Sequence, residues 1–171
     1  DIHVTSDTQD QDGASLRRPL DVAIMAAGKG TRTKSRLPKV LQPLAGRPLV
    51  HHVLDTAGDL QARQAVLITG HGAIEVEASC SMDTRADGQL AISFVRQEPQ
   101  LGTGHAVQQA VPVLADDGVV LVLSGDVPLT RPATLYHLVT ACAGENLALL
   151  TLRMPDPTGY GRIVRQGGLE H

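Results

Sequence analysis

The sequence LDVAIMAAGKGTRTKSRLPK at residues 20–39 joins an apolar run to a basic loop that contains two glycines. The apolar run is typical of a buried strand, and Gly28 and Gly30 free the backbone just after it ends. No Asp or Glu occurs between Asp21 and Asp55. The basic residues of the loop are Lys29, Arg32, Lys34, Arg36 and Lys39. A glycine loop that leaves a strand presents backbone N–H groups to an anion, and basic side chains add charge. The stretch therefore predicts a site for a nucleotide polyphosphate.

The spacing of the glycines excludes two common phosphate-binding loops. A P-loop needs four residues between its glycines, followed by Lys and Ser or Thr, whereas only Lys29 separates Gly28 from Gly30. The dinucleotide fingerprint needs a third Gly or Ala where this chain has Thr33. The sequence therefore indicates a phosphate loop of a third kind. The alternative is a strand-to-loop turn with a solvated basic surface.

Strands and helices are predicted to alternate along the chain. Apolar runs predict strands at 20–26, 64–69, 90–95, 119–123 and 147–153, with a short one at 163–165. Helical spacing predicts helices at 48–60, 73–81, 103–114 and 132–143. The run at 119–123 is the most apolar, which is typical of a strand covered on both faces. The alternation predicts an α/β fold with a Rossmann-like, doubly wound, mostly parallel sheet flanked by helices.

Composition excludes several classes of protein. The 171 residues suit one domain with its own core. Aromatic residues make up 2% and the net charge is −3, which argues against a nucleic-acid surface. The two cysteines cannot form a disulfide framework and show no metal-ligand spacing. No apolar run approaches the ~20 residues of a membrane span. We therefore expect a cytoplasmic protein that binds neither nucleic acid nor membrane.

The two ends of the chain differ in composition from the rest. Residues 1–18 have the polar composition of a disordered extension. Residues 169–171 resemble the remnant of a histidine tag. These features predict an expressed fragment of a longer protein, with a folded domain at 19–168.

Two further segments carry side chains suited to a nucleotide site. Asp126 follows the most apolar strand and a glycine, which is a good position for a Mg²⁺ ligand between phosphates. Its alternative role is that of a turn or cap residue. Gln97 is an amide that can pair with a nucleobase edge that has both a donor and an acceptor. Near it, a Gly-Thr-Gly sequence allows close backbone approach, with Thr103 as a possible N-cap. We expect His105 to pack or to support the site rather than to act as an acid or base.

Two adjacent histidines and the two cysteines are not expected to carry chemistry. His51 and His52 are adjacent on a predicted helix and cannot both face one metal ion. Cys80 and Cys142 have no basic neighbour in the sequence to activate either thiol as a nucleophile. We interpret all four residues as structural.

The basic loop, Gly28-x-Gly30-Thr31-Arg32 followed by Pro38-Lys39, resembles the signature loop of the sugar-nucleotidyltransferases. Within that superfamily it is most similar to the N-terminal half of the bacterial bifunctional N-acetylglucosamine-1-phosphate uridylyltransferases/glucosamine-1-phosphate acetyltransferases. The resemblance runs from about Leu20 to Arg165. It implies the nucleotide-diphospho-sugar transferase fold. It also implies transfer of a uridylyl group from UTP to N-acetylglucosamine 1-phosphate, giving pyrophosphate and UDP-N-acetylglucosamine for peptidoglycan synthesis.

The resemblance assigns roles residue by residue. It implies that Arg32, Lys39 and Asp126 are catalytic, with Asp126 as the ligand of Mg²⁺. The residues implied to bind the nucleotide or the sugar are Met25, Ala26, Ala27, Gly28, Lys39, Gln97, Gly102, Thr103, Ser124, Gly125, Asp126 and Gly161. Position 124 is Ser where the family usually has Tyr or Asn, so the metal ligand is kept while that side chain's contact with uridine and sugar is not implied.

The resemblance also implies what this chain would lack. In the family, the uridylyltransferase half continues further and supplies a glutamate and asparagines to the site. We therefore expect this chain to bind UTP weakly and to turn over poorly. The acetyltransferase half, through which the family forms homotrimers, is expected to be missing too. Two alternatives remain open. One is a nucleotidyltransferase of other specificity, such as a molybdopterin guanylyltransferase or one for another sugar phosphate. The other is a non-catalytic module that binds nucleotide sugars.

Overall fold

The computed structural model describes residues 18–28, 37–81, 90–153, 155, 156, 158 and 163. The chain divides into two compact units, one formed by residues 14–148 and the other by 1–13 together with 149–171. The first unit holds all the helices and strands of the described residues. In the second, Asp156 Oδ1 accepts hydrogen bonds from the backbone N–H and the hydroxyl of Thr158. These bonds lower the pKa of Asp156.

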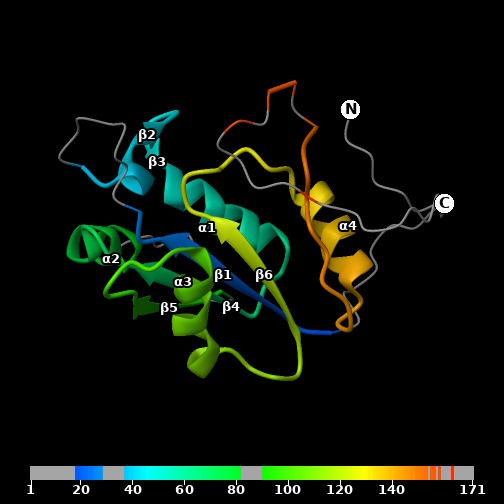
Figure 1. Cartoon of the computed structure of the whole chain (residues 1–171). Helices are drawn as coiled ribbons and strands as arrows, with labels where there is room; N and C mark the ends of the chain where they lie inside the picture. Colours follow the sequence, from blue (N-terminus) through cyan, green and yellow to red (C-terminus); the bar gives the residue numbers. More distant parts are fainter. Residues whose placement is uncertain are drawn as a thin grey trace. The chain divides into compact units, whose positions relative to one another are not determined.

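A four-stranded parallel sheet organises the first unit (Figure 1). Its strands are β1 (Leu20–Ala26), β4 (Gln64–Thr69), β5 (Ala91–Arg96) and β6 (Val119–Ser124). Their order across the sheet is β5-β4-β1-β6, and every pair is parallel. Because β1 lies between β4 and β6, the chain crosses over on each side of it, as doubly wound sheets do. The predicted α/β fold class is confirmed.

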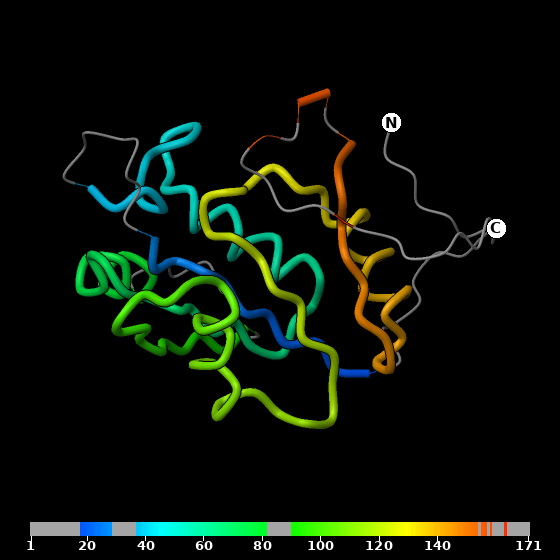
Figure 2. Tube along the Cα trace, viewed as in Figure 1, coloured from blue at the N-terminus to red at the C-terminus, as the bar shows by residue number. Residues whose placement is uncertain are grey.

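Helices α1 (Leu49–Asp59), α2 (Ala73–Ser81), α3 (Thr103–Ala110) and α4 (Pro132–Cys142) connect or follow the strands. Figure 2 follows this alternation from β1 in blue to α4 in orange. On one face of the sheet, buried side chains of α1, α2 and α4 pack with Val22 and Ile24 of β1 in the larger core cluster. On the other face, Ala106 and Ala110 of α3 pack with Ala23 of β1. Strand β1 is therefore covered on both sides, as its apolar sequence predicts.

Most predicted elements agree with the structure within a few residues. The strands at 20–26 and 64–69 and the helix at 73–81 have the predicted bounds. The predicted helix at 103–114 is instead α3 followed by the 3-10 helix η2 (Val111–Val113). Pro112 explains the change, because its nitrogen cannot donate the hydrogen bond that would continue the α-helix.

The prediction that the strand at 119–123 is covered on both faces is wrong. Val119 and Leu121 are buried, but Val120 and Val122 are 38% and 40% exposed. Among the described strands β6 lies at the edge of the sheet, and α3 packs on β1, β4 and β5 instead. A continuous apolar run predicts burial but cannot show which neighbours provide it.

The predicted strand at 147–153 is also not observed, and the residues there have no regular structure. Its leucines are exposed, Leu147 by 85% and Leu152 by 70%. A strand needs a hydrogen-bonded neighbour, and none of the described strands pairs with this segment. Of the predicted strand at 163–165, Ile163 has no regular structure and the other two residues lie outside the described part.

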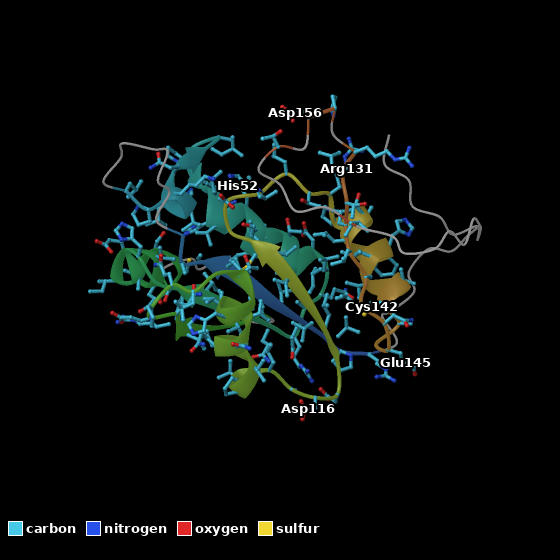
Figure 3. The ribbon with its side chains drawn as sticks, in the orientation of Figure 1. His52, Asp116, Arg131, Cys142, Glu145 and Asp156 are labelled. Carbon is cyan, nitrogen blue, oxygen red and sulfur yellow. The ribbon has the colours of Figure 1, made fainter. Side chains whose placement is uncertain are left out.

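A small hairpin, which the sequence analysis did not predict, precedes α1. Strands β2 (Pro43–Leu44) and β3 (Arg47–Pro48) pair antiparallel across Ala45-Gly46, and both turn residues have positive φ. The Nε2 atom of His52 on α1 donates to Leu44 O at 2.8 Å (Figure 3). Arg47 Nη1 pairs with Asp55 Oδ2 at 2.6 Å. The hairpin is thus attached to α1, and His52 has the structural role expected for it.

The edge of the sheet at the amino ends of its strands is held by an ion-pair network. Asp21 is 1% exposed, and its carboxylate accepts from Arg63 Nε at 2.9 Å and Arg63 Nη2 at 3.0 Å. Arg63 also pairs with Asp117 at 2.9 Å. Burial alone would raise the pKa of Asp21, but hydrogen bonds from Arg63 and Gln64 and the charge of Arg63 lower it to a greater extent. The buried carboxylate is therefore ionised and paired.

None of the described helices is long and apolar enough to cross a bilayer.

We predict that Arg63→Met destabilises the chain by about 3 kcal/mol at neutral pH, because it leaves a buried carboxylate unpaired. Urea denaturation measures this change. The folded-state pKa of Asp21 lies below its unfolded value, so the pair contributes stability above the unfolded pKa and loses it as the pH falls through the folded pKa. The difference in free energy of unfolding between the variant and the unsubstituted chain should accordingly decrease at acid pH.

The control is Arg18→Met, which removes an exposed ion pair with Glu145 at 3.8 Å. Exposed pairs contribute at most about 1 kcal/mol. If the Arg63 variant is as stable as this control, Arg63 does not stabilise the buried carboxylate of Asp21.

Candidate functional site

The carboxyl ends of the parallel strands gather the predicted site residues at one edge of the sheet. Gly125 N donates to Met25 O at 2.9 Å, which places the turn after β6 beside the end of β1. Gln97 N donates to Thr69 O at 2.8 Å, which places the end of β5 beside that of β4. At the same edge, β1 ends with Met25 and Ala26, and Ala27 and Gly28 follow it. In open α/β sheets this edge is where ligands bind.

Lys39 and Asp126 are brought together from distant parts of the sequence. Lys39 Nζ lies 2.5 Å from Asp126 Oδ2. Lys39 begins the 3-10 helix η1 (Lys39–Leu41), whose other residues, Val40 and Leu41, are buried and anchor it. The Lys39 side chain is half exposed and that of Asp126 is 23% exposed. Two predicted catalytic residues are thus adjacent and open to a ligand.

Gly125 makes this approach possible. A Cβ atom at this position would lie 3.1 Å from Met25 O and 3.1 Å from Val40 Cγ1. A side chain here would therefore push β1, η1 and the turn after β6 apart. The glycine before Asp126 thus suits the close packing under the ion pair.

Asp126 is held in its ionised form. Ser124 Oγ donates to Asp126 Oδ1 at 2.6 Å, while Lys39 pairs with Oδ2. Burial alone would raise the pKa of Asp126, but hydrogen bonds from Lys39 and Ser124 and the charge of Lys39 lower it to a greater extent. The pKa therefore lies below the usual range, and the carboxylate is charged at neutral pH.

The donor set at Asp126 fits a magnesium ion of the kind that binds together with a nucleotide. Mg²⁺ keeps several waters and takes one or two carboxylates plus phosphate oxygens. Asp126 is an ionised, partly exposed carboxylate at the sheet edge. No group of three or more His, Cys, Asp or Glu among the described residues could hold a metal without a substrate. The described residues thus offer a single carboxylate to such an ion.

Gln97 lies at the end of β5 and is only 4% exposed. Its Nε2 lies 2.9 Å from Gly102 O and 3.1 Å from His105 Nδ1. Gly102 has φ +97°, which favours glycine, and its carbonyl also accepts from Ala106 N. The segment from Gly102 is therefore folded around the Gln97 amide.

The alternative role of Thr103, that of an N-cap, is not observed. Thr103 is the first residue of α3, Gly102 occupies the cap position, and no side chain bonds the helix end. Thr103 and Gly104 are exposed there. A side-chain cap was inferred from residue type alone, and the backbone conformation of Gly102 shifts the helix start by one residue.

Some predicted site residues lie outside the described part of the chain. They are Arg32 and Gly161, together with Lys29, Gly30, Lys34 and Arg36 of the basic loop. Their roles remain as predicted from the sequence.

Two features of the site were missed by the sequence analysis. The first is the hydrogen bond of Ser124 to Asp126. The second is Gly72, which follows β4 with φ +67°. A Cβ at Gly72 would overlap the ring of Pro38, the residue before η1. The signal available in the sequence was the glycine pair Gly70 and Gly72 directly after a buried strand, as at β1.

Among the described residues, His51 and both cysteines have structural roles. His51 Nε2 and Ser79 Oγ are 2.9 Å apart, joining α1 to α2. Cys80 is buried in the larger core cluster and Cys142 packs against it. Neither lies among the residues of the candidate site.

Curated relatives resemble this chain along most of its length. Proteins named "Bifunctional protein GlmU" from Acidovorax sp. (strain JS42) and Polaromonas naphthalenivorans (strain CJ2) are 70% identical over 149 residues. These matches cover 87% of this chain but 31% and 32% of the relatives. A protein of the same name from Cellvibrio japonicus (strain Ueda107) is 55% identical over 146 residues, which cover 85% of this chain and 31% of that protein. The chain therefore spans about a third of the length of these relatives.

Solved structures share the fold. A nucleotidyl transferase from Methanothermobacter thermautotroptrophicus aligns with a TM-score of 0.58 at 24% identity, covering 71% of this chain and 57% of that one. A UDP-glucose pyrophosphorylase complexed with UDP-glucose aligns with a TM-score of 0.61 at 19% identity, covering 72% and 53%. These similarities confirm the predicted nucleotide-diphospho-sugar transferase fold.

A family model described as a MobA-like NTP transferase domain matches residues 22–164, which include β1, the pair of Lys39 with Asp126, and Gln97. With its strands parallel and its candidate site at their carboxyl ends, the chain belongs to the MobA-like NTP transferase domain family of nucleotidyltransferases.

Proposed function

We propose that this chain transfers a uridylyl group from UTP to N-acetylglucosamine 1-phosphate. The family match supports nucleotidyl transfer as the class of reaction. The sequence motifs at the basic loop, Gln97 and Asp126 support uridine and this sugar phosphate as the substrates. The observation that carries the proposal is the pair of Lys39 with the ionised Asp126, at 2.5 Å, where phosphates would bind at the sheet edge.

In the proposed reaction, a phosphate oxygen of the sugar phosphate attacks the α-phosphorus of UTP. The bond from this phosphorus to the oxygen that bridges it to the β-phosphate breaks, and pyrophosphate leaves with the electron pair. The attacking phosphate is already an anion at neutral pH, so no general base is needed. Negative charge grows on the leaving pyrophosphate, and fixed cations there lower the barrier.

Lys39 and Asp126 have complementary parts in this scheme. The ammonium of Lys39 is half exposed and can exchange its contact with Asp126 for one with a phosphate oxygen. The carboxylate of Asp126 would then hold Mg²⁺, whose charge offsets that of the phosphates when it is bound. Arg32 is proposed to add a second cation from the basic loop. Ser124 keeps one oxygen of Asp126 oriented throughout.

Gln97 is proposed to recognise the base. The Gln97 nitrogen already donates to Gly102 O, so the amide offers its carbonyl oxygen to a nucleobase edge, and burial makes a mismatched partner costly. The Gln97 side chain is buried beside the Gly102 turn, where the backbone can approach a ligand closely.

We predict that Asp126→Asn abolishes the Mg²⁺ dependence of UTP binding, because a neutral amide is a much poorer Mg²⁺ ligand. Calorimetric titration with UTP, with and without Mg²⁺, measures this dependence. The matched control is Asp116→Asn, an exposed carboxylate in the β5–β6 connection (Figure 3). Mg²⁺-dependent binding that persists in the Asp126 variant would refute the proposed metal role.

The same titration with GTP and CTP separates this proposal from its rivals. A preference for GTP would indicate a guanylyltransferase of another specificity. A nucleotide that binds equally well to the unsubstituted chain and to both the Asp126 and Lys39 variants would indicate a binding module without metal chemistry.

We predict that Lys39→Met weakens binding of Mg²⁺–UTP by about tenfold or more, since a charged hydrogen bond to phosphate contributes about 1.5–3 kcal/mol. Lys39→Arg should restore part of the affinity because it keeps the charge. Nucleotide titration measures both variants. Equal affinities for the Met variant and the unsubstituted chain would exclude a phosphate contact.

We predict that Ser124→Ala raises the pKa of Asp126, because it removes a hydrogen bond that favours the carboxylate. Weaker Mg²⁺-dependent UTP binding at mildly acidic pH should follow, with less effect at neutral pH. Ser124→Thr keeps the hydroxyl and serves as the control. Titration of the Asp126 carboxyl carbon by NMR measures the pKa, and an unchanged value in the Ala variant would contradict the prediction.

A further inference from the structure

Two contacts of its nitrogen determine the orientation of the Gln97 amide. Its Nε2 lies 2.9 Å from Gly102 O and 3.1 Å from His105 Nδ1. The oxygen and nitrogen of an amide are normally assigned from their hydrogen bonds. A backbone carbonyl can only accept, so the atom facing Gly102 O must be the nitrogen. The Gln97 amide therefore cannot be reversed without placing two oxygens against each other.

The same argument fixes the tautomer of His105. One hydrogen of the Gln97 amide nitrogen is directed to Gly102 O, and the second is directed to His105 Nδ1. Nδ1 must then carry a lone pair, and the proton of the neutral ring lies on Nε2. A proton on Nδ1 would oppose the Gln97 donor.

Gln109 completes the arrangement one turn along α3. Its Nε2 lies 3.2 Å from His105 Nε2 and 3.2 Å from His105 O. A neutral imidazole cannot accept at both nitrogens, so one amide must offer its oxygen to the ring. Gln109 is the one that turns, because it is only partly buried and the bond that it gives up, to His105 O, is 3.2 Å long. Gln97, by contrast, is 4% exposed and its bond to Gly102 O is 2.9 Å long.

With its nitrogen engaged twice, Gln97 presents its carbonyl oxygen, Oε1, as the remaining group. None of the described residues donates a hydrogen bond to this oxygen. In the described part of the chain, Ser93 Oγ is the one buried side-chain atom without a partner, so Gln97 Oε1 is not fully buried. It is therefore an acceptor at the end of β5 that is unpaired among the described residues and not fully enclosed, in a residue that is 4% exposed. An acceptor in this place accepts from the N3–H of uracil and repels N3 of cytosine, which is itself an acceptor.

We propose that His105 is a positioning residue for base selectivity. Its Nδ1 atom, together with Gly102 O, holds the Gln97 amide so that the carbonyl oxygen faces the base and favours uracil over cytosine. The inference rests on the proposed function, because it assumes that a pyrimidine nucleotide binds beside Gln97. It adds a role for a residue that need not touch the nucleotide.

Two substitutions separate this role from simple packing. His105→Leu keeps a branched side chain of similar reach but removes the acceptor. His105→Asn places a carbonyl oxygen two bonds from Cβ, where Nδ1 of histidine lies, and so restores an acceptor for Gln97. The control is Gln108→Ala, at an exposed position of the same helix.

The experiment is calorimetric titration of each chain with Mg²⁺–UTP and Mg²⁺–CTP. The ratio of the two affinities should fall by about three- to tenfold in the Leu variant, the range expected for one neutral hydrogen bond. The Asn variant should recover most of the ratio, and the Gln108 variant should keep it. A packing role would lower both affinities together and leave the ratio unchanged.

A second measurement needs no nucleotide. The imidazole ¹⁵N shifts of His105 should show an unprotonated Nδ1 and a protonated Nε2, and a proton on Nδ1 would overturn the proposal. An unchanged UTP/CTP ratio in the Leu variant would also overturn it while leaving the proposed function intact. If the unsubstituted chain shows no preference for UTP, the proposed function itself fails, and the base-selectivity role falls with it.

Discussion

The position of β1 between β4 and β6 is the constraint on which the rest of the structure depends. Val22, Ala23 and Ile24 have no exposed surface, because helices pack on both faces of this strand. The parallel register then aligns the ends of β1 and its neighbours at one edge. The hydrogen bond from Gly125 to Met25 extends that alignment into the turn that carries Asp126. Burial in the centre of the sheet thus sets the geometry of the polar edge.

Sequence periodicity predicted the elements whose burial is local in origin. The strands at 20–26 and 64–69 are buried nearly throughout, so their apolar composition sufficed. Sequence periodicity failed where the secondary structure depends on partners that are distant in the sequence. The leucines at 147–152 are as apolar as those strands, yet no described strand pairs with them. The β2–β3 hairpin is too short for periodicity to register, and its formation depends on contacts of Leu44 and Arg47 with α1.

The candidate site also contains residues that the sequence predicted and residues that it did not. The residue types at Lys39, Gln97 and Asp126 were recognisable because their chemistry and spacing match a motif, and the fold brings Lys39 and Asp126 into contact. Their supporting partners were not foreseeable. Ser124 and His105 act through the direction of one hydrogen bond each, and that direction exists only after the turns after β6 and β5 are formed. Sequence indicates the candidate site residues more readily than the residues that orient them.

The contact between Gly72 and Pro38 has a consequence for how sequences of this kind can diverge. Pro38 directly precedes Lys39, and the space beside its ring is available only because residue 72 has no side chain. The two positions lie in different loops, and neither reacts. A side chain at position 72 would meet the ring of Pro38, and the positive φ of Gly72 would strain it in any case. The sequence constraint on the lysine therefore extends to a glycine in a second loop, which takes no part in the chemistry but preserves the location of η1.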